Sequence, residues 1–316
     1  MKKVLLASTV LAMSASVAAA EVAVSGSARM GVAYNSEAPN EFGFTSRVRV
    51  AFALSGESDS GLSFGASIRA DNSGNGNNGT GGDVNGAGSM SAGNVFVSGA
   101  FGKLTMGDVD GAAELVTGDL AGVGLTGLGD HNENTFLSNG NTFARSAARY
   151  EYSTGGLTFA LSANNPQFDG ELVGSPAAVQ NSNTYSIGVK YAVDAYAFGL
   201  GYETTDTAAG VSVDHIIGMA QGTFSGVTVK VTYGEASDID FTQYGISASY
   251  KMDALGLTAY HRVAETGIRK DKFTGIGASY DLGGGASVVG GLVDVNRGIG
   301  GGADLTRADL GLSFAF

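Results

Sequence analysis

The sequence predicts an all-β protein: a transmembrane, antiparallel, up-and-down β-barrel of 16 strands. Three observations predict this fold class. Apolar and polar residues alternate with period two along nearly the whole chain, which indicates strands with one oily and one wet face. Short and long connections alternate between these segments, as in bacterial outer-membrane barrels. With 51 glycines and no tryptophan in 316 residues, the chain has few large side chains to fill a soluble interior.

The first element is a predicted secretory signal peptide, MKKVLLASTVLAMSASVAAA. Lys2 and Lys3 give a positive start, an apolar run extends to Val17, and three alanines form a small-residue cleavage site. The alternative, an N-terminal membrane anchor, is disfavoured because the apolar run is short for a bilayer. We therefore expect residues 1–20 to be removed and residues 21–316 to form a single barrel domain.

The stretch FTSRVRVAFALSG (44–56) shows the two faces most clearly. Phe44, Val48 and Leu54 fall on one face of a strand, whereas Arg47 and Arg49 fall on the other. Facing lipid, each arginine would cost about 2–4 kcal/mol near the middle of the bilayer. We therefore expect both arginines to point into a water-filled lumen and the apolar residues to contact lipid.

The same alternation predicts all the other strands. The expected strands span residues 21–34, 42–56, 61–71, 91–101, 103–109, 145–154, 156–164, 183–193, 195–204, 213–224, 226–235, 240–252, 254–264, 271–282, 285–295 and 303–316. Near 213–224 and 285–296 the pattern does not assign the two faces. In the final segment, Leu310, Leu312 and Phe314 alternate with Arg307 and Asp309.

The predicted connections divide into two groups. Tight turns alternate with longer polar connections at 35–41, 72–90, 110–144, 165–182, 205–212, 236–239, 265–270 and 296–302. In a meander every second connection lies at the same end, so we expect tight turns at one end and long loops at the other. A soluble sandwich or solenoid is the alternative, but 16 consecutive strands without a visible linker disfavour it.

The net charge argues against one class of partner, and the cysteine content bears on stability. Without Lys2 and Lys3, 16 basic residues remain against 30 acidic ones, a net charge near −14. Nucleic acid is excluded as a partner because its recognition calls for a basic patch. The chain has no cysteines, so no disulfides stabilise it.

The candidate functional residues are charged side chains expected inside the barrel. A basic wall is predicted from Arg29, Arg47, Arg49, Arg69, Arg145 and Arg149. Facing it, the longest connection (110–144) supplies Glu114, Asp119, Asp130 and Glu133. This connection also carries apolar residues that an exposed loop would not need, so we expect it to fold into the lumen. The alternative is a solvated external loop with unrelated acids.

Three segments carry a family resemblance: EVAVSGSARMGVAYN after the cleavage site, SGAFGKLTMGDVDGA from Ser98 to Ala112, and the terminal LGLSFAF ending on Phe316. The chain resembles the general diffusion porins of the Gram-negative outer membrane, most closely the alphaproteobacterial type. The resemblance implies a 16-stranded barrel in outer-membrane lipid, a homotrimer, and passive diffusion of ions and small hydrophilic solutes. It also implies that the third long loop forms the constriction against the wall arginines.

The remaining predictions concern cofactors and competing functions. No cofactor is required, although Asp108, Asp110 and Glu114 are weak candidates for calcium because clustered carboxylates suit that ion. No catalytic motif is apparent, so we expect no enzyme activity. The competing interpretations are a structural or adhesive outer-membrane barrel and a solute-specific channel.

Overall fold

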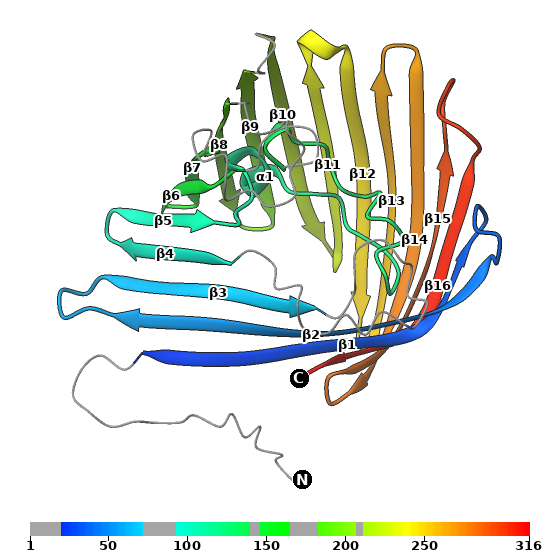
Figure 1. The fold of residues 1–316 in the computed structure, drawn as a ribbon, viewed down its shortest axis with the longest axis horizontal. Helices are drawn as coiled ribbons and strands as arrows, with labels where there is room; N and C mark the ends of the chain where they lie inside the picture. The colour runs from blue at the N-terminus through cyan, green and yellow to red at the C-terminus, as the bar shows by residue number, and fades with distance from the viewer. Residues whose placement is uncertain (1–19, 72–92, 140–145, 165–182, 207–210) are drawn as a thin grey trace.

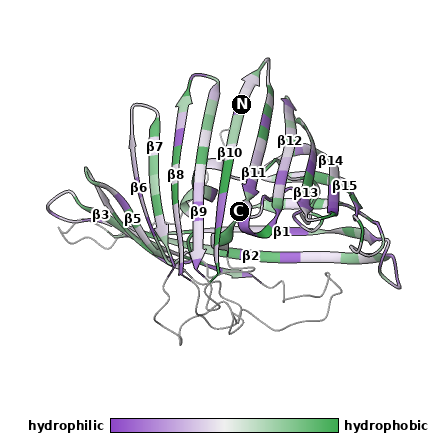
Figure 2. Ribbon diagram, turned by 90° about the horizontal axis from the view of Figure 1, so that it is seen from above, coloured by the Kyte–Doolittle hydropathy of each residue, from purple (hydrophilic) through white to green (hydrophobic). Residues whose placement is uncertain are grey.

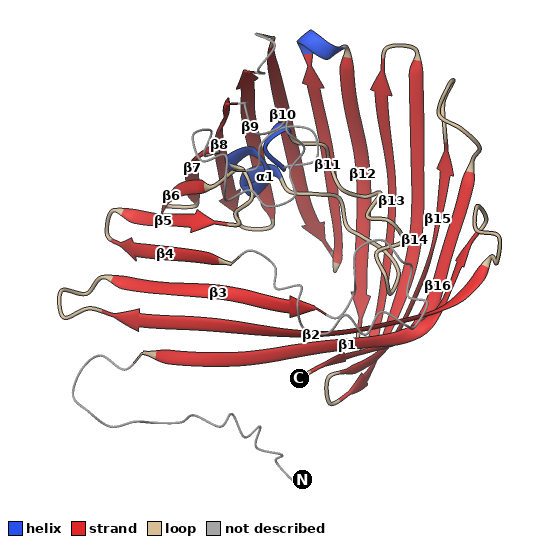
Figure 3. Ribbon diagram, in the orientation of Figure 1, coloured by secondary structure: helices blue, strands red, loops and turns tan. Residues whose placement is uncertain are grey.

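The computed structural model describes residues 20–71, 93–139, 146–164, 183–206 and 211–316. Its strands form one closed antiparallel barrel in which each strand pairs with its sequence neighbours and β1 pairs with β16 (Figures 1 and 3). The strands are β1 (Glu21–Asn35), β2 (Phe42–Glu57), β3 (Ser63–Asp71), β4 (Asn94–Gly99), β5 (Gly102–Gly107), β6 (Ala148–Thr154), β7 (Leu157–Ala163), β8 (Asn183–Val193), β9 (Tyr196–Asp206), β10 (Ser212–Phe224), β11 (Val227–Ala236), β12 (Phe241–Met252), β13 (Leu255–Thr266), β14 (Arg269–Gly283), β15 (Ala286–Asn296) and β16 (Leu305–Ala315). The 16-stranded barrel predicted from the sequence is confirmed.

Closure of the barrel removes the free sheet edges. β1 and β16 pair from Ser27 opposite Ala315 to Asn35 opposite Arg307. In lipid, each unpaired backbone N–H or C=O group costs several kcal/mol. A closed sheet has no edge strand, so it avoids this cost. Across the described ranges, helices are too short or too polar to pass through a bilayer.

The two faces of β2 lie as the alternation predicted. Phe44 is 79% exposed and Val48 52% exposed on the outer face, where Val48 lies opposite Ala28 of β1. Arg47 and Arg49 alternate with them and lie on the inner face. Figure 2 shows the same alternation of hydrophobic and hydrophilic positions along other strands.

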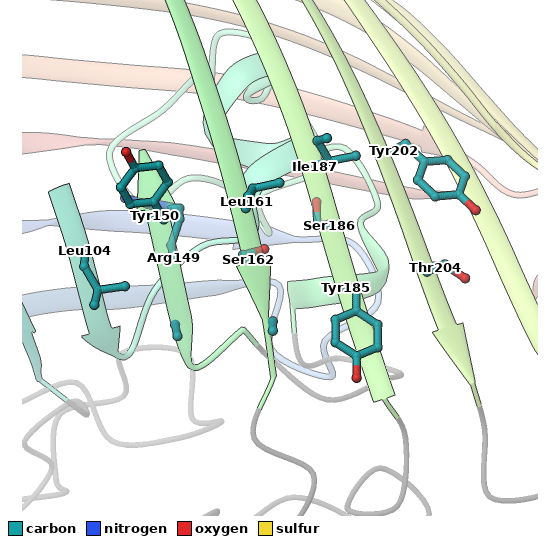
Figure 4. Close-up of a pocket in the computed structure, with 12 residues that line it drawn as sticks. Leu104, Arg149, Tyr150, Leu161, Ser162, Tyr185, Ser186, Ile187, Tyr202 and Thr204 are labelled. Carbon is teal, nitrogen blue, oxygen red and sulfur yellow. The ribbon is translucent and has the colours of Figure 1, made fainter. Parts of the chain in front are cut away.

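Tyrosines and aliphatic side chains lie side by side on the outer surface over β5 to β9 (Figure 4). Leu161 and Ile187 lie between Tyr150 of β6 and Tyr202 of β9, and Tyr185 lies two residues from Ile187 along β8 (Figure 4). The Tyr150 hydroxyl donates to the backbone oxygen of Phe101, and the Tyr202 hydroxyl donates to Asp214 Oδ1 at 2.9 Å. Rings with an apolar body and a hydrogen-bonded tip suit the boundary between hydrocarbon and headgroups.

The connection between β5 and β6 is called the inner loop below, and its described residues, 108–139 and 146–147, lie inside the barrel (Figure 1). It contains the helix α1 (Ala112–Thr117) and the 3₁₀ turn η1 (Leu137–Asn139). A second 3₁₀ turn, η2 (Ser237–Ile239), joins β11 to β12. The inward fold expected for the inner loop is confirmed.

The buried core lies between the inner loop and the inner wall. One cluster joins loop residues to wall residues of β13, β15 and the start of β16: Leu120, Val123, Leu128, Tyr260, Val293, Val295 and Leu305. At the other end of the loop, α1 packs on β7 to β10. Gly201 permits this approach, because a Cβ there would lie 2.5 Å from the Ala113 side chain.

This core explains the two segments whose faces the sequence left open. On β10, Val213 and Ile217 point inward and are buried. On β15, Val293 and Val295 do the same under the inner loop. These strands are apolar on both faces, one against lipid and the other against the loop, so the alternation is weak there.

One predicted long connection is a short turn in the structure. Residues 265–270 were expected to form a long loop, but β13 extends to Thr266 and β14 begins at Arg269. Only Gly267 and Ile268 remain between them, and Gly267 adopts φ of 58°, a left-handed conformation that glycine accepts readily. The polar residues Glu265 and Lys270 lie on the strands themselves, where they form an ion pair.

Candidate functional site: the charged lumen

The predicted arginine wall is assembled from adjacent strands. Arg29 of β1 lies opposite Arg47 of β2, and Ser27 lies opposite Arg49. Arg69 of β3 lies opposite Ala51 of β2. Residues that lie opposite each other in paired strands point to the same face of the sheet. These four arginines therefore share the inner face over β1 to β3. The wall is therefore a compact cationic surface in the lumen.

Of the two remaining predicted wall residues, the structure describes only Arg149. Arg149 of β6 donates from Nη1 to the backbone oxygen of Asp110 at 2.9 Å, so it holds the start of the inner loop. Arg145 lies outside the described residues. Arg29 also contacts the inner loop, since its Nη1 donates to the backbone oxygen of Leu125 at 3.1 Å.

An acid on the wall itself, Asp71, was missed at the sequence level. Arg49 binds it through two hydrogen bonds, Nε to Oδ1 at 2.7 Å and Nη2 to Oδ2 at 3.1 Å. Arg69 Nε lies 3.2 Å from Asp71 Oδ2. Asp71 ends the predicted strand 61–71 and lies two residues after Arg69, on the same face of the strand, and this spacing was the available signal.

The inner loop is fixed near its tip by Asp309 of β16. The Asp309 carboxylate accepts hydrogen bonds from the backbone N–H of Leu125 at 2.8 Å and of Thr126 at 2.7 Å. It also accepts one from the Thr126 hydroxyl at 2.7 Å. Three donors on one buried carboxylate make a strong attachment, because hydrogen bonds to a charged acceptor are the stronger kind.

A buried polar network holds the returning arm of the loop. Glu203 of β9 is fully buried and accepts from the Leu137 N–H at 2.8 Å and from the N–H and hydroxyl of Ser138. His215 Nδ1 lies 3.0 Å from Glu203 Oε2, and Gln243 Nε2 lies 3.2 Å from His215 Nε2.

The network continues toward β13. Gln243 donates to the Thr135 oxygen at 2.7 Å and accepts from the Thr135 N–H at 2.8 Å. Arg262 donates to the Thr135 hydroxyl at 3.0 Å and to Gln243 at 3.2 Å. Side chains of β9, β12 and β13 thus hold three loop residues, Thr135, Leu137 and Ser138, by hydrogen bonds. The sequence offered one signal, polar residues at inward positions of otherwise apolar faces, and it was not used.

Three of the four predicted loop acids lie in the part of the inner loop between α1 and η1. Burial and the neighbouring carboxylates of Asp130 and Asp119 raise the pKa of Glu133 to about 7, against a smaller opposing effect of Arg262. Burial also raises the pKa of Asp119, although the Asn134 N–H donates to its carboxylate at 2.7 Å. Asp119, Asp130 and Glu133 therefore form one interacting group, and Glu114 lies in the first turn of α1.

Loop and wall charges also interact at Arg29. Asp130 attracts Arg29 electrostatically, while Asp309 attracts it more strongly. Nearby, His131 stacks on Phe273 with ring centroids 5.0 Å apart. Burial, reinforced by Arg307, lowers the pKa of His131 to about 4, so this imidazole is neutral at pH 7.

The calcium prediction at Asp108, Asp110 and Glu114 stays a prediction. The described part of the chain contains no group of three or more His, Cys, Asp or Glu side chains arranged to hold a metal ion.

The chain resembles known porins over nearly its full length. Residues 7–298 match the model of the Gram-negative porin family. A Rhodobacter capsulatus porin is 34% identical over 94% of this chain and 100% of its own length. A solved porin structure refined at 1.8 Å is 32% identical, covers 94% of this chain and all of that one, and superposes with a TM-score of 0.75.

A mutant of the Rh. blastica porin shares the fold at 21% identity, with 93% of this chain and 100% of that chain covered and a TM-score of 0.68. The family match, the identity to the R. capsulatus protein and the closed barrel with its inner loop agree. The chain belongs to the Gram-negative porin family, the non-enzymatic channels of the outer membrane.

Proposed function

We propose that ions and small hydrophilic solutes cross this outer-membrane channel through a constriction between the inner loop and the arginine wall of β1 to β3. The observation that carries the proposal is the attachment of the loop inside the barrel. Asp309 and Glu203 hold it at two separate points, so it occupies the lumen as a fixed partition.

The charges give this constriction an electrostatic character. Arg29, Arg47, Arg49 and Arg69 lie on one side, and Asp119, Asp130 and Glu133 lie on the loop. Rings or patches of opposite charge in a pore select by the sign and polarity of the solute. Small polar solutes are therefore favoured over apolar ones, because only polar groups recover their lost hydration in such a field.

The oligomer is proposed to be a homotrimer, as the family resemblance implies, and the height of the wall supports contact between copies. β4 and β5 have 6 residues each and β6 and β7 have 7 each, against 15 and 16 in β1 and β2. At about 3.4 Å per residue a 6-residue strand extends about 20 Å before tilt, less than the ~25 Å apolar band of such barrels. Another copy covering β4 to β7 relieves this mismatch.

The proposed function is tested with purified protein in a planar bilayer. Stepwise increases in conductance are expected, and liposomes carrying the protein are expected to swell in small sugars. Folded, inserted protein that leaves the bilayer ion-tight overturns the proposal and favours a structural or adhesive barrel. Competitive block of the current by one solute would instead indicate a solute-specific channel.

A further inference from the structure

The cationic wall does not present four equivalent charges to the lumen. Asp71 pairs with both Arg49 and Arg69, and its side chain is only 13% exposed. The contact with Arg49 is bidentate, the geometry that most strongly fixes a guanidinium on a carboxylate. Arg49 is thus held on the wall by Asp71, while Arg69, whose side chain is 45% exposed, shares the same negative charge.

Arg47 lies next to this ion triad but outside it. It is two residues from Arg49 on the same inner face, about 6.6 Å along the strand. Within the described part of the chain, no carboxylate lies within ion-pair distance of its guanidinium. Arg29, Arg49 and Arg69 repel Arg47 electrostatically, Asp71 attracts it without pairing with it, and its side chain is half-buried.

We propose that Asp71 determines the ion preference of the pore by restraining Arg49 and Arg69, which leaves Arg47 as the principal anion-attracting group of the wall. This inference rests on the proposed constriction. Without Asp71 the wall gains a net positive charge, and two guanidinium groups are released to extend into the bore. With Asp71 present, the loop acids face a wall whose net charge is one unit lower than its four arginines alone would give.

The expected effect follows from Coulomb's law. One unit charge about 7 Å from the path of an ion, in water, changes the local ion concentration about threefold. Removing one acid acts on cations and anions in opposite directions, so the ratio of their permeabilities changes more than either alone. Releasing two arginines adds to this change, since both charges move closer to the path.

The test compares Asp71→Asn with Asp130→Asn in planar bilayers under a salt gradient. Both variants remove one negative charge from the lumen, and asparagine tolerates the left-handed backbone of residue 130, where φ is 53°. We expect Asp71→Asn to shift the reversal potential toward anion selectivity more than Asp130→Asn does. The change in the anion-to-cation permeability ratio is expected to be about twice as large. Equal shifts overturn the inference, because Asp71 would then count only as one further acid.

A second comparison leaves Asp71 intact, and so does not depend on the folding of the first variant. Arg47→Gln and Arg49→Gln each remove one positive charge from the same face of β2. We expect the larger shift toward cations from Arg47→Gln, since the charge of Arg49 is already opposed by Asp71. A larger or equal shift from Arg49→Gln overturns the inference. Wild-type protein without conductance would instead contradict the porin function itself.

Discussion

The buried carboxylate of Glu203 offers the sharpest test of how the inner loop is held. The substitution Glu203→Gln keeps the size of the side chain but replaces one oxygen with an NH₂ group. In the wild type, Oε2 accepts from the Leu137 N–H and Oε1 accepts from Ser138. Whichever way the amide turns, one of these buried backbone N–H groups then faces another donor.

The size of the effect follows from these contacts. A buried donor left without an acceptor costs about 1–3 kcal/mol, and the remaining bonds lose the strength of a charged acceptor. We therefore expect the attachment of residues 137 and 138 to weaken by about 2–4 kcal/mol. A loop with weaker attachment samples open positions more often, so the current through a single channel becomes noisier and the pore admits larger solutes.

The assay is single-channel recording, together with the size cut-off for swelling of proteoliposomes. Glu235→Gln is the matched control, because Glu235 is an exposed glutamate of β11 outside the network. The control is expected to match the wild type in noise and cut-off. If Glu203→Gln also matches the wild type in both, the buried network does not position the loop and the reasoning is refuted.

The remaining predictions concern charge, lipid and pH. Replacing Arg47 and Arg49 together by glutamine is expected to raise cation preference, since the loop acids then go less opposed; an unchanged reversal potential would contradict this. Val48→Arg places a charge on the lipid face at a cost of about 2–4 kcal/mol near the midplane, so folding into vesicles is expected to be impaired, and wild-type yield would argue against the assigned face. Because the pKa of Glu133 is raised to about 7, its carboxyl gains negative charge as the pH rises through that value, and cation preference is expected to rise with it. Glu133→Gln is expected to flatten this pH dependence, and an unaltered profile would show that another group titrates.

The fold was predictable because a barrel in lipid makes one simple demand on every strand. Arg47 and Val48 are adjacent and must face opposite sides of the strand. Their polarity indicates that Arg47 faces water and Val48 faces lipid. The pattern is weak only where the inner loop supplies a second apolar environment, at Ile217 and Val293. Those contacts join residues far apart in the chain, and alternation within a single strand carries no information about them.

The site was predictable in composition but not in pairing. The sequence indicated that arginines and acids gather in the lumen, yet it paired the arginines with the loop acids. The structure pairs Arg49 and Arg69 with Asp71, which the register of β2 against β3 brings opposite Arg49. Likewise Glu203 and His215 meet only because β9 and β10 are in register, opposite each other. Register follows from the turns and from the closure of the whole barrel, so single segments do not reveal it.

The assignment of one strand face to water and the other to lipid is tested most directly by thiol labelling, since the natural chain has no cysteines. Single cysteines replace Arg47 and Val48, and a charged, membrane-impermeant thiol reagent is added to open channels in a bilayer. We expect the reagent to modify the residue-47 variant and change its current, while the residue-48 variant stays unmodified. Rapid modification at position 48, with none at position 47, would contradict the assigned faces and the water-filled bore derived from them.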